Sequence, residues 1–360
     1  MSNITPNTNF SFQNIYASQV RKRQIDLSLS ENPLGCSPKI NQILQILSIS
    51  DLVDYPQPNS QDLVSELASN FKLNVESIMV GNGSEALLAL IGKVLLGPDS
   101  EVILPSLSFP MFKELVGLAN SKAIKISMTD SLEIDLSKMQ KAITINTNLI
   151  IICNPNNPTG MVLSSKDLIN FVQSTKTLVL IDEANIEFGG ESMISQVNKL
   201  PNLLVLRTLS KGFGLAGLRI GFLAGNKNFI RKLKANMPIF PISRLASTIA
   251  RIAINDDDFI KDTNIFINKQ REYLIQKIIK LGFIVLPSQT NNLFIKVTPF
   301  FKDGRQCSNK LVSQNVSVVN GAFFGEEGKN FVRISVRNPK INQLFINILS
   351  DIVKNRKEKI

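Results

Sequence analysis

Residues 210–221 have the sequence SKGFGLAGLRIG, a glycine-rich segment that contains one lysine and one arginine. They follow the apolar run Leu203–Leu206, which predicts a buried β-strand. Lys211 therefore stands just after a strand, with a hydroxyl before it and Arg219 eight positions later. Lysine forms an imine with an aldehyde, and glycines let the backbone approach a ligand closely. Alone, so short a motif is more typical of an exposed basic loop, so its interpretation depends on the rest of the chain.

The composition is that of an ordinary globular protein. The 360 residues are 44% hydrophobic, enough for one large core and a second, smaller domain. The net charge of +11 comes from scattered lysines and arginines that are not interleaved with aromatic residues, so we expect no nucleic-acid partner. The chain has no long apolar run and opens without a signal-peptide pattern. We therefore expect a soluble cytoplasmic protein that does not bind membranes.

Histidine is absent from the sequence, which excludes histidine general bases, Ser-His-Asp triads and most catalytic metal sites. The three cysteines, Cys36, Cys153 and Cys307, are widely spaced. This spacing argues against both a disulfide framework and a zinc site, and it fits a reducing compartment. We expect no metal, and any proton shuttle must be a lysine, a tyrosine or a carboxylate.

Apolar runs recur along the first two thirds of the chain, mostly separated by helical patterns. They lie near residues 78, 102, 150, 179, 204 and 221. This alternation predicts an α/β fold with a mostly parallel, doubly wound sheet whose functional loops lie at its carboxyl edge. The remainder predicts a smaller α+β domain. The expected division is 1–30 as an N-terminal arm and the start of the small domain, 31–265 as the large domain and 266–360 as the small domain.

Two strand-to-helix junctions carry candidate ligand contacts. In GNGSE, a glycine turn with Gly83 and Ser84 leads into an apolar helix, an arrangement that binds anions at the helix N-terminus. Ser84 also fits an ordinary helix cap. Phe109 follows the next strand, where an aromatic ring can stack on a planar ligand or simply belong to the core.

Two further strand ends carry polar groups. Asn157 lies in the loop NPNNPTG, whose prolines and asparagines exclude helix and strand and display amides. Asp182 ends an apolar strand, where a buried carboxylate is costly unless it pairs with a cation. A protonated pyridine nitrogen is such a cation, so Asp182 together with Lys211 fits pyridoxal phosphate.

Taken in order, these motifs amount to a family resemblance. The series is GNGSE, SFPMF, NPNNPTG, IDEA, SKGFGLAGLR and VRISV, spread over about residues 25–350. It resembles the fold-type-I pyridoxal-phosphate enzymes, and most closely the histidinol-phosphate aminotransferase subgroup of the class I/II aminotransferases.

The resemblance implies a homodimer with shared active sites that transfers an amino group between an amino acid, or a similar amine, and a 2-oxo acid. Lys211 would carry the cofactor covalently and act as the catalytic residue. The cofactor contacts implied are Asp182 on the ring nitrogen, Asn157 and Asn185 near the phenolate oxygen, Phe109 on the ring, and Gly83, Ser84, Ser210, Arg219 and the partner's Tyr55 on the phosphate. The substrate contacts implied are Arg333 for the α-carboxylate, Asn32 beside it and Tyr16 from the N-terminal arm.

One departure from the family pattern bears on the reaction. Asn185 stands where most of these aminotransferases have a tyrosine, and an amide can still donate a hydrogen bond. The related threonine-phosphate decarboxylases also lack this tyrosine, so decarboxylation stays open as the alternative reaction. A non-catalytic, cofactor-binding protein is a further, minor alternative.

A second departure bears on the substrate. The segment 318–325, VVNGAFFG, lacks the arginine that histidinol-phosphate aminotransferases use for the substrate phosphate, and it is closer to the general amino-acid aminotransferases. Arg244 and Arg337 are candidates for binding an acidic side chain or a phosphate, and each fits a surface ion pair equally well.

Overall fold

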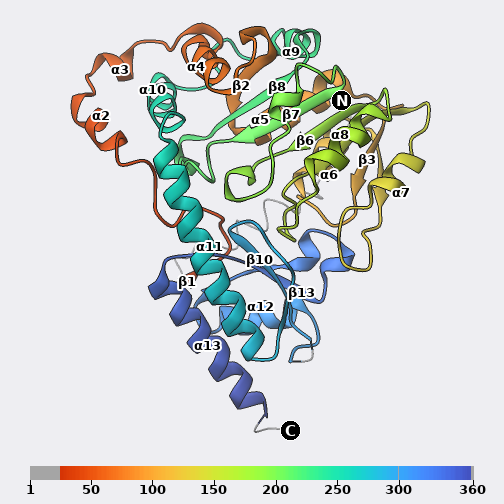
Figure 1. Cartoon of the computed structure of the whole chain (residues 1–360), viewed down its shortest axis with the longest axis vertical. Coiled ribbons are helices and arrows are strands. Elements are labelled where there is room, and N and C mark those ends of the chain that lie inside the picture. The colour runs from red at the N-terminus through yellow and green to blue at the C-terminus, as the bar shows by residue number, and fades with distance from the viewer. Residues whose placement is uncertain (1–24, 299, 358–360) are drawn as a thin grey trace, which may run out of the picture.

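The computed structural model of the chain describes residues 25–298 and 300–357 (Figure 1). Most of the predicted N-terminal arm, including Tyr16, lies outside the described residues. Among the described residues, no helix is both long and apolar enough to span a membrane.

A seven-stranded sheet forms the centre of the larger part, with the strand order β2-β8-β7-β6-β5-β3-β4. Its strands are β2 (Ile78–Asn82), β3 (Glu101–Pro105), β4 (Lys122–Ile126), β5 (Thr147–Cys153), β6 (Leu178–Asp182), β7 (Leu203–Thr208) and β8 (Ile220–Gly225). Only β8 runs antiparallel to its neighbours in this sheet. The predicted α/β fold with a mostly parallel sheet is therefore confirmed. The prediction missed β4, an edge strand whose KAIKI sequence has no continuous apolar run.

Both faces of this sheet are buried, which explains the unbroken apolar runs of its strands. Along β7, Leu203 and Val205 point into one core, while Leu204 and Leu206 point into the other. The first core is covered by α4 (Gln61–Phe71), α8 (Ser165–Gln173) and α10 (Arg244–Ala253). The second is covered by α5 (Gly83–Leu95), α6 (Met111–Leu118) and α9 (Lys227–Lys234). The short helix α7 (Leu136–Lys141) precedes β5.

The C-terminal part contains a smaller sheet of order β12-β13-β10-β9 (Figure 1, lower half). Its strands are β9 (Ile284–Val285), β10 (Asn292–Lys296), β12 (Val319–Asn320) and β13 (Phe331–Ser335). Beside it, β1 (Ile25–Asp26) pairs with β11 (Val316–Ser317), so the start of the described chain joins this part. Its helices are α11 (Asp257–Lys280), α12 (Gly304–Val312) and α13 (Pro339–Lys357). The limits 31–265 and 266–360 of the two domains stay a prediction.

Residues 244–280 form two successive helices, α10 and α11. The break between them contains Asp256, which is buried. Its carboxylate accepts hydrogen bonds from the Ser37 hydroxyl and the Lys39 ammonium. This contact ties the break to the segment that leads into α2 (Ile40–Ile46).

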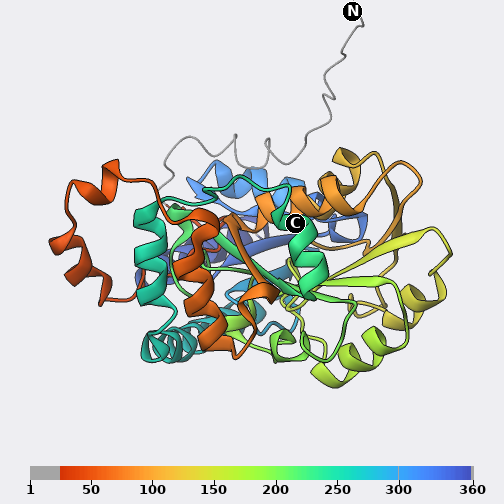
Figure 2. The same cartoon turned by 90° about the horizontal axis from the view of Figure 1, so that it is seen from above.

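Two short helices, α2 and α3 (Ser50–Val53), project from the side of the molecule in both views (Figure 2). They carry apolar side chains that are largely exposed: Leu44, Ile46, Ile49, Leu52 and Val53. Tyr55 follows them, 80% exposed, with its ring stacked on Phe240. This part of the surface is apolar over several turns of chain.

Candidate active site

A cavity opens at the carboxyl edge of the large sheet, between that sheet and the small one. It gathers most of the predicted site residues: Ser84, Phe109, Asn157, Asp182, Asn185, Ser210, Lys211, Arg219 and Arg333. We call Asp182, Asn185, Ser210 and Lys211, which follow β6 and β7, the large-sheet wall. We call Ser30, Asn292 and Arg333 the small-sheet wall, together with Ser335, which hydrogen-bonds to Ser30 and Asn292 without itself lining the cavity. The large-sheet wall exists because the carboxyl ends of parallel strands meet at one edge.

Asp182 ends β6 and is only 2% exposed. Its Oδ1 accepts a hydrogen bond from the backbone N–H of Ala184 at 3.0 Å. Burial raises the pKa of this carboxyl from 3.8 to about 7, and the neighbouring Glu183 carboxylate raises it further. A cation at this place would favour the ionised form and relieve the cost of burying it.

Glu183 points into a separate buried cluster. Its Oε2 lies 3.9 Å from Arg207 Nη1 and accepts a hydrogen bond from Ser192. Arg207 also pairs with Glu187 at 2.5 Å and lies over the ring of Phe71. Burial raises the pKa of Glu183 to about 7, and Arg207 opposes this shift. The cluster fixes the loop after β6 to the strand that leads to Lys211.

Lys211 is half-buried in the loop after β7. Burial lowers the pKa of its amine from 10.5 to about 8, and the nearby Arg333 guanidinium adds to this shift. Such an amine is partly neutral near neutral pH, the state in which it attacks a carbonyl or accepts a proton. The position after a parallel strand is what the sequence predicted for it.

One end of the cavity is lined by Arg219, Ser210 and Ser84. Arg219 Nη1 lies 3.4 Å from the Ser210 hydroxyl, and its Nη2 lies 3.6 Å from Glu85. Gly83 has φ +78° and begins α5, and a Cβ there would lie 2.9 Å from the Arg219 guanidinium. Only glycine fits beside this arginine. The helix N-terminus, a guanidinium and two hydroxyls together suit a phosphate group.

Arg333 reaches the cavity from β13 and is 3% exposed. Its Nη1 donates to Asn157 Oδ1 at 2.9 Å, and its Nη2 donates to the backbone carbonyl of Ser28. The Asn157 amide nitrogen is then the group that can donate to a ligand. The guanidinium also packs over the Phe324 ring, 5.2 Å from its centroid. A rigid, buried guanidinium is suited to binding a carboxylate.

Asn185 lies in the cavity at 4% exposure, and its Oδ1 has no hydrogen-bond partner among the described residues. Phe109 is half-buried and packs edge-on against Phe112, so its ring belongs partly to the core and partly to the cavity. A buried polar atom without a partner is costly, and it marks a place where a ligand can contribute the missing contact.

Three predicted residues do not line the cavity. Asn32 donates to the backbone carbonyl of Gly212 at 2.8 Å and to Thr263, so it holds the Lys211 loop rather than Arg333. Gly83 lies behind Arg219 at the start of α5. Tyr55 lies on the outer surface with Phe240.

The sequence analysis missed several residues of the cavity: Leu29, Ser30, Glu85, Cys153, Ala184, Thr208 and Asn292. Glu85, Cys153, Ala184 and Thr208 adjoin or lie close to motif residues, and this closeness was the available signal. Ser30 and Asn292 meet across 262 positions of sequence, and no local pattern connects them. Within the described ranges, no group of histidine, cysteine or carboxylate side chains is arranged to hold a metal ion.

Comparisons with known proteins agree with this geometry. The model of the family described as aminotransferase class I and II matches residues 22–348. A histidinol-phosphate aminotransferase of Clostridium beijerinckii is 30% identical over 346 residues, covering 94% of each chain. One from Methanosphaera stadtmanae is 30% identical, covering 92% of this chain and 91% of the relative.

Solved structures show the same fold. The histidinol-phosphate aminotransferase of Sinorhizobium meliloti in complex with pyridoxal-5'-phosphate has a TM-score of 0.89 at 23% identity, covering 99% of this chain and 98% of that one. Aspartate aminotransferase from Thermus thermophilus with maleate has a TM-score of 0.84 at 19% identity, covering 94% and 95%.

The fold and the cavity define a pyridoxal-phosphate enzyme of fold type I. The chain belongs to the aminotransferase class I and II family. It is a pyridoxal-phosphate-dependent aminotransferase, which transfers an amino group between an amino acid, or a similar amine, and a 2-oxo acid. Nothing in these findings favours the decarboxylase alternative.

The residues of the cavity fit this cofactor. Asp182 is a buried carboxylate with no cationic side chain paired to it among the described residues, and a protonated pyridine nitrogen would supply a cation. Arg219, Ser84 and Ser210 meet beside the glycine that begins α5, where a phosphate can bind. Lys211 lies in the same cavity and offers the amine for covalent attachment.

Proposed function

We propose that the amine donor of this aminotransferase is an amino acid whose α-carboxylate binds Arg333. The observation that carries this proposal is the buried guanidinium of Arg333, which donates to Asn157 through Nη1 and to the Ser28 carbonyl through Nη2. Arg219, the other arginine among the lining residues that the structure describes, lies at the phosphate end beside Ser210. Among the described residues, one lining guanidinium is thus left for an anionic group on the substrate.

Lys211 is the catalytic residue in this proposal. When bound, the cofactor supplies an electron sink for the electron pair left at the substrate Cα. Arg333 holds the carboxylate so that the Cα–H bond faces Lys211, and the amine of Lys211 takes and returns the proton. Asp182 would keep a positive charge on the ring nitrogen, and the Asn157 and Asn185 amides would bind the phenolic oxygen. Ser84, Ser210 and Arg219 would hold the phosphate, and Phe109 would pack on the ring.

The segment 318–325 supports an amino acid rather than an amino-alcohol phosphate as the donor. Asn320 stands in this segment, is 9% exposed, and caps the following turn by accepting from the Ala322 N–H at 3.2 Å. It does not line the cavity. This segment therefore brings no second cation to the cavity for a dianionic phosphate.

A half-reaction assay tests the donor. The purified holoenzyme is mixed in turn with each amino acid and with histidinol phosphate, and the cofactor absorbance is followed. We expect conversion to the amine form of the cofactor, with release of a 2-oxo acid, for at least one amino acid. Conversion by histidinol phosphate alone would overturn the donor proposal, and release of carbon dioxide would overturn the assigned reaction.

We also propose that the enzyme is a homodimer in which Tyr55 contacts the phosphate in the partner's site. The support is the exposed apolar surface of α2 and α3, next to the 80% exposed Tyr55 ring. Such a surface is expected to be covered by another protein. Mixing Tyr55→Phe with Lys211→Ala subunits would give heterodimers with one intact site, so activity should reappear on mixing. An active monomer, or no recovery although heterodimers form, would contradict the shared site.

For location, we propose the cytoplasm. All three cysteines are thiols that form no disulfide in the part of the chain that the structure describes, and two of them, Cys153 and Cys307, are buried. Burial raises the pKa of the Cys153 thiol well above its usual value, which keeps it protonated and unreactive. Cell fractionation with an antibody to the protein tests the location.

A further inference from the structure

A second cavity adjoins the active-site cavity, and the function proposed above does not use it. Its volume is about 320 Å³, and it lies where residues of the segment 104–110 meet residues of the segment 322–326. We call it the second cavity. Among the described lining residues, Phe109 alone lines both cavities. The second cavity is therefore a neighbour of the active-site cavity and not an extension of it.

The two segments that form the second cavity are packed tightly against each other. The Ser106 hydroxyl donates to the Glu327 carboxylate, and the Ser108 N–H donates to the Phe324 carbonyl at 3.2 Å. A Cβ on Gly325 would lie 2.1 Å from the Ser106 carbonyl oxygen, so glycine is needed for this approach. The cavity thus depends on the contact between the end of β3 and the segment that follows β12.

Two phenylalanine side chains connect the second cavity to the active site. Phe109 lines both cavities. Phe324 lines the second one, is 7% exposed, and has the Arg333 guanidinium 5.2 Å from its ring centroid. Phe323, which is 43% exposed, adds a third ring to the lining. Aromatic rings gathered in this way are suited to packing on a planar apolar ligand.

Two lysines bring positive charge to the second cavity. Lys113 lies in the first turn of α6 and Lys125 in the edge strand β4, and neither forms an ion pair with a described carboxylate. Two carboxylates also line the cavity. Glu326 pairs with Lys329 at 3.0 Å, and Glu114 directly follows Lys113 on the helix, where consecutive side chains point apart. The two ammonium groups are therefore open to an anion.

The two arginines considered as anion sites from the sequence lie elsewhere. Arg244 pairs with Asp51 and Asp54, and Arg337 pairs with Glu31. Neither arginine lines the active-site cavity or the second cavity.

We propose that the second cavity binds a small aromatic monocarboxylate, and that this ligand strengthens substrate binding in the active-site cavity. The ring would pack among the three phenylalanines, and the carboxylate would meet the two ammonium groups. The binding site goes beyond the proposed function. The effect on the substrate rests on that function, because it takes Arg333 as the site of the substrate carboxylate.

Size and charge together select this class of ligand. A volume of about 320 Å³ is at the lower end of ligand pockets and admits one ring with a short chain. A single carboxylate matches two ammonium groups that face one unpaired carboxylate. A polyanion would place further charges against the phenylalanine rings, where they would lose their hydration without gaining a partner.

The expected effect on the substrate follows from the shared contacts. A ligand that touches both segments favours the arrangement in which Phe324 stays beside Arg333. A substrate whose carboxylate binds Arg333 favours the same arrangement, so each ligand should bind more tightly in the presence of the other.

Calorimetric titration of the holoenzyme with 3-phenylpropionate tests the site, and 3-phenylpropionamide is the uncharged matched ligand. Lys113→Met/Lys125→Met removes the two charges, and Ala322→Trp fills the cavity from an exposed lining position. The matched control is Lys141→Met/Lys166→Met, because these lysines are also exposed and line neither cavity.

A second series in the Arg333→Met background separates this site from carboxylate binding in the active site. We expect Arg333→Met to keep one site for 3-phenylpropionate, with a dissociation constant on the order of 1 mM or lower. Adding Lys113→Met/Lys125→Met should weaken this binding about fivefold or more. The amide should bind as weakly as the acid does to that variant.

The control lysine substitutions should change nothing, and Ala322→Trp should abolish binding at the second cavity. Equal binding by the two double-lysine variants would overturn the proposal, because the charges at the cavity would then have no role. So would binding that survives Ala322→Trp unchanged, or the absence of any 3-phenylpropionate site in Arg333→Met.

The half-reaction with an amino acid tests the effect on the substrate. We compare the wild type with Lys113→Met/Lys125→Met, in which 3-phenylpropionate can only compete at Arg333. Without the probe, the amino acid concentration that gives half-maximal conversion should be equal in the two proteins. With the probe, it should be lower in the wild type by about fivefold or more.

Equal values in the presence of the probe would overturn the effect on the substrate. A failure of the proposed function is distinguishable from this outcome. If no amino acid converts the cofactor, the donor proposal fails, whereas the calorimetric titration still decides whether the second cavity binds its ligand.

Discussion

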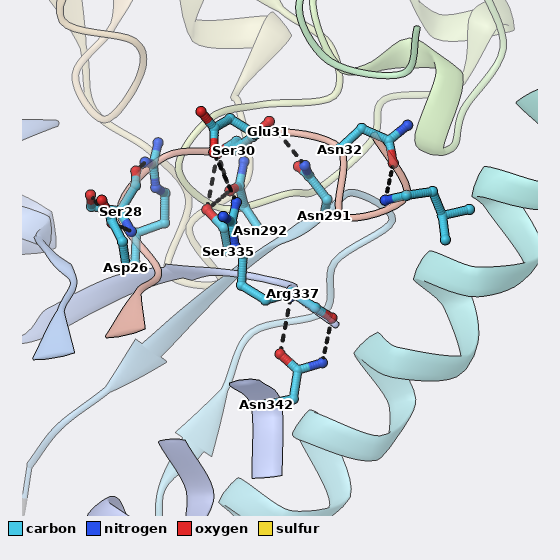
Figure 3. A network of polar contacts seen from close by, with 12 residues as sticks. Asp26, Ser28, Ser30, Glu31, Asn32, Asn291, Asn292, Ser335, Arg337 and Asn342 are labelled. Atoms are coloured by element: carbon cyan, nitrogen blue, oxygen red, sulfur yellow. Dashed lines mark hydrogen bonds and ion pairs between the residues drawn. The ribbon is translucent and has the colours of Figure 1, made fainter. Parts of the chain in front are cut away.

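The two walls of the cavity satisfy their polar groups in different ways. On the large-sheet wall, Asp182 is buried with a raised pKa, and Asn185 Oδ1 has no partner among the described residues. On the small-sheet wall, the Ser30 and Ser335 hydroxyls both donate to Asn292 Oδ1, at 2.5 and 3.1 Å (Figure 3). The first wall is incomplete without a ligand, whereas much of the second is completed by the protein itself.

The difference indicates that the large-sheet wall binds the cofactor and that the small-sheet wall positions the substrate. Burying a charge without a counter-ion costs free energy that a bound cation returns, so the large-sheet wall favours the charged, permanent cofactor. A wall of mutual hydrogen bonds is instead rigid before any ligand arrives. Arg333 is held beside it by Asn157 and the Ser28 carbonyl, so its guanidinium stays in one place for substrates that bind and leave.

Lys211→Ala should lower turnover about a thousandfold or more, because the large-sheet wall loses both the covalent attachment point and the proton carrier. Steady-state turnover is the measurement. Borohydride reduction of the wild type, followed by peptide mapping, should place the cofactor on Lys211. Lys227→Ala, at an exposed position at the start of α9, is the control and should keep full activity. A label on any other lysine would contradict the assignment.

Arg333→Met should lower kcat/KM for the amino acid donor about a hundredfold, because a buried charge partner of the carboxylate is lost. The kcat/KM of Arg333→Lys should lie between those of the wild type and Arg333→Met. Lysine keeps the charge but lacks the forked guanidinium that donates to both Asn157 and Ser28. Ser335→Ala on the same strand removes one hydroxyl and should change kcat/KM less than about threefold. Equal losses of kcat/KM for Arg333→Met and Ser335→Ala would contradict a specific role of the Arg333 charge in binding the substrate carboxylate.

The pH dependence of stability tests the burial of Asp182 on the large-sheet wall. Its pKa rises from 3.8 in the unfolded chain to about 7 in the folded one, so the folded state holds its proton longer. Cofactor-free protein should therefore lose stability as the pH rises from about 5 to 7, by up to about 1.4 kcal/mol per pH unit from this group.

Asp182→Asn should remove the part of the pH dependence of stability that comes from the Asp182 carboxyl. The measurement is urea unfolding of the cofactor-free protein at several pH values. Glu183, whose pKa is also raised by burial, supplies the pH dependence that remains in Asp182→Asn. In the holoenzyme the slope should also shrink, because the pyridinium favours the ionised carboxylate. If the wild type and Asp182→Asn have the same pH dependence, Asp182 is not the group that titrates.

The same division explains how much the sequence could predict. The large-sheet wall follows from local rules, since Asp182 and Lys211 stand just after apolar strands whose carboxyl ends share an edge. Ser30 and Ser335 meet only because two segments 305 residues apart are folded together, and serines carry no periodic signal. Arg333 was predicted only through the family motif VRISV. The edge strand β4 was missed because Lys122 and Lys125 interrupt its apolar pattern.

Asn185→Ala should have the smallest effect and the most informative one. In the cofactor-free protein the Asn185 Oδ1 is buried with no hydrogen-bond partner among residues 25–298 and 300–357, so its removal should leave stability unchanged or raise it by about 1 kcal/mol. In the holoenzyme the amide is a ligand contact, and its loss should weaken cofactor binding about tenfold. Urea unfolding and cofactor titration measure the two effects.

Asn156→Ala is the matched control, because Asn156 is an equally buried asparagine whose polar groups are satisfied by the protein. Its Oδ1 accepts from Ser108 at 2.9 Å, and its Nδ2 donates to the Leu107 carbonyl and to Thr159. Its loss leaves those groups unpaired, so it should destabilise the cofactor-free protein by about 1–3 kcal/mol. If Asn185→Ala destabilised the cofactor-free protein as much, Asn185 would be a structural residue, and the contrast between the two walls would fail at that position.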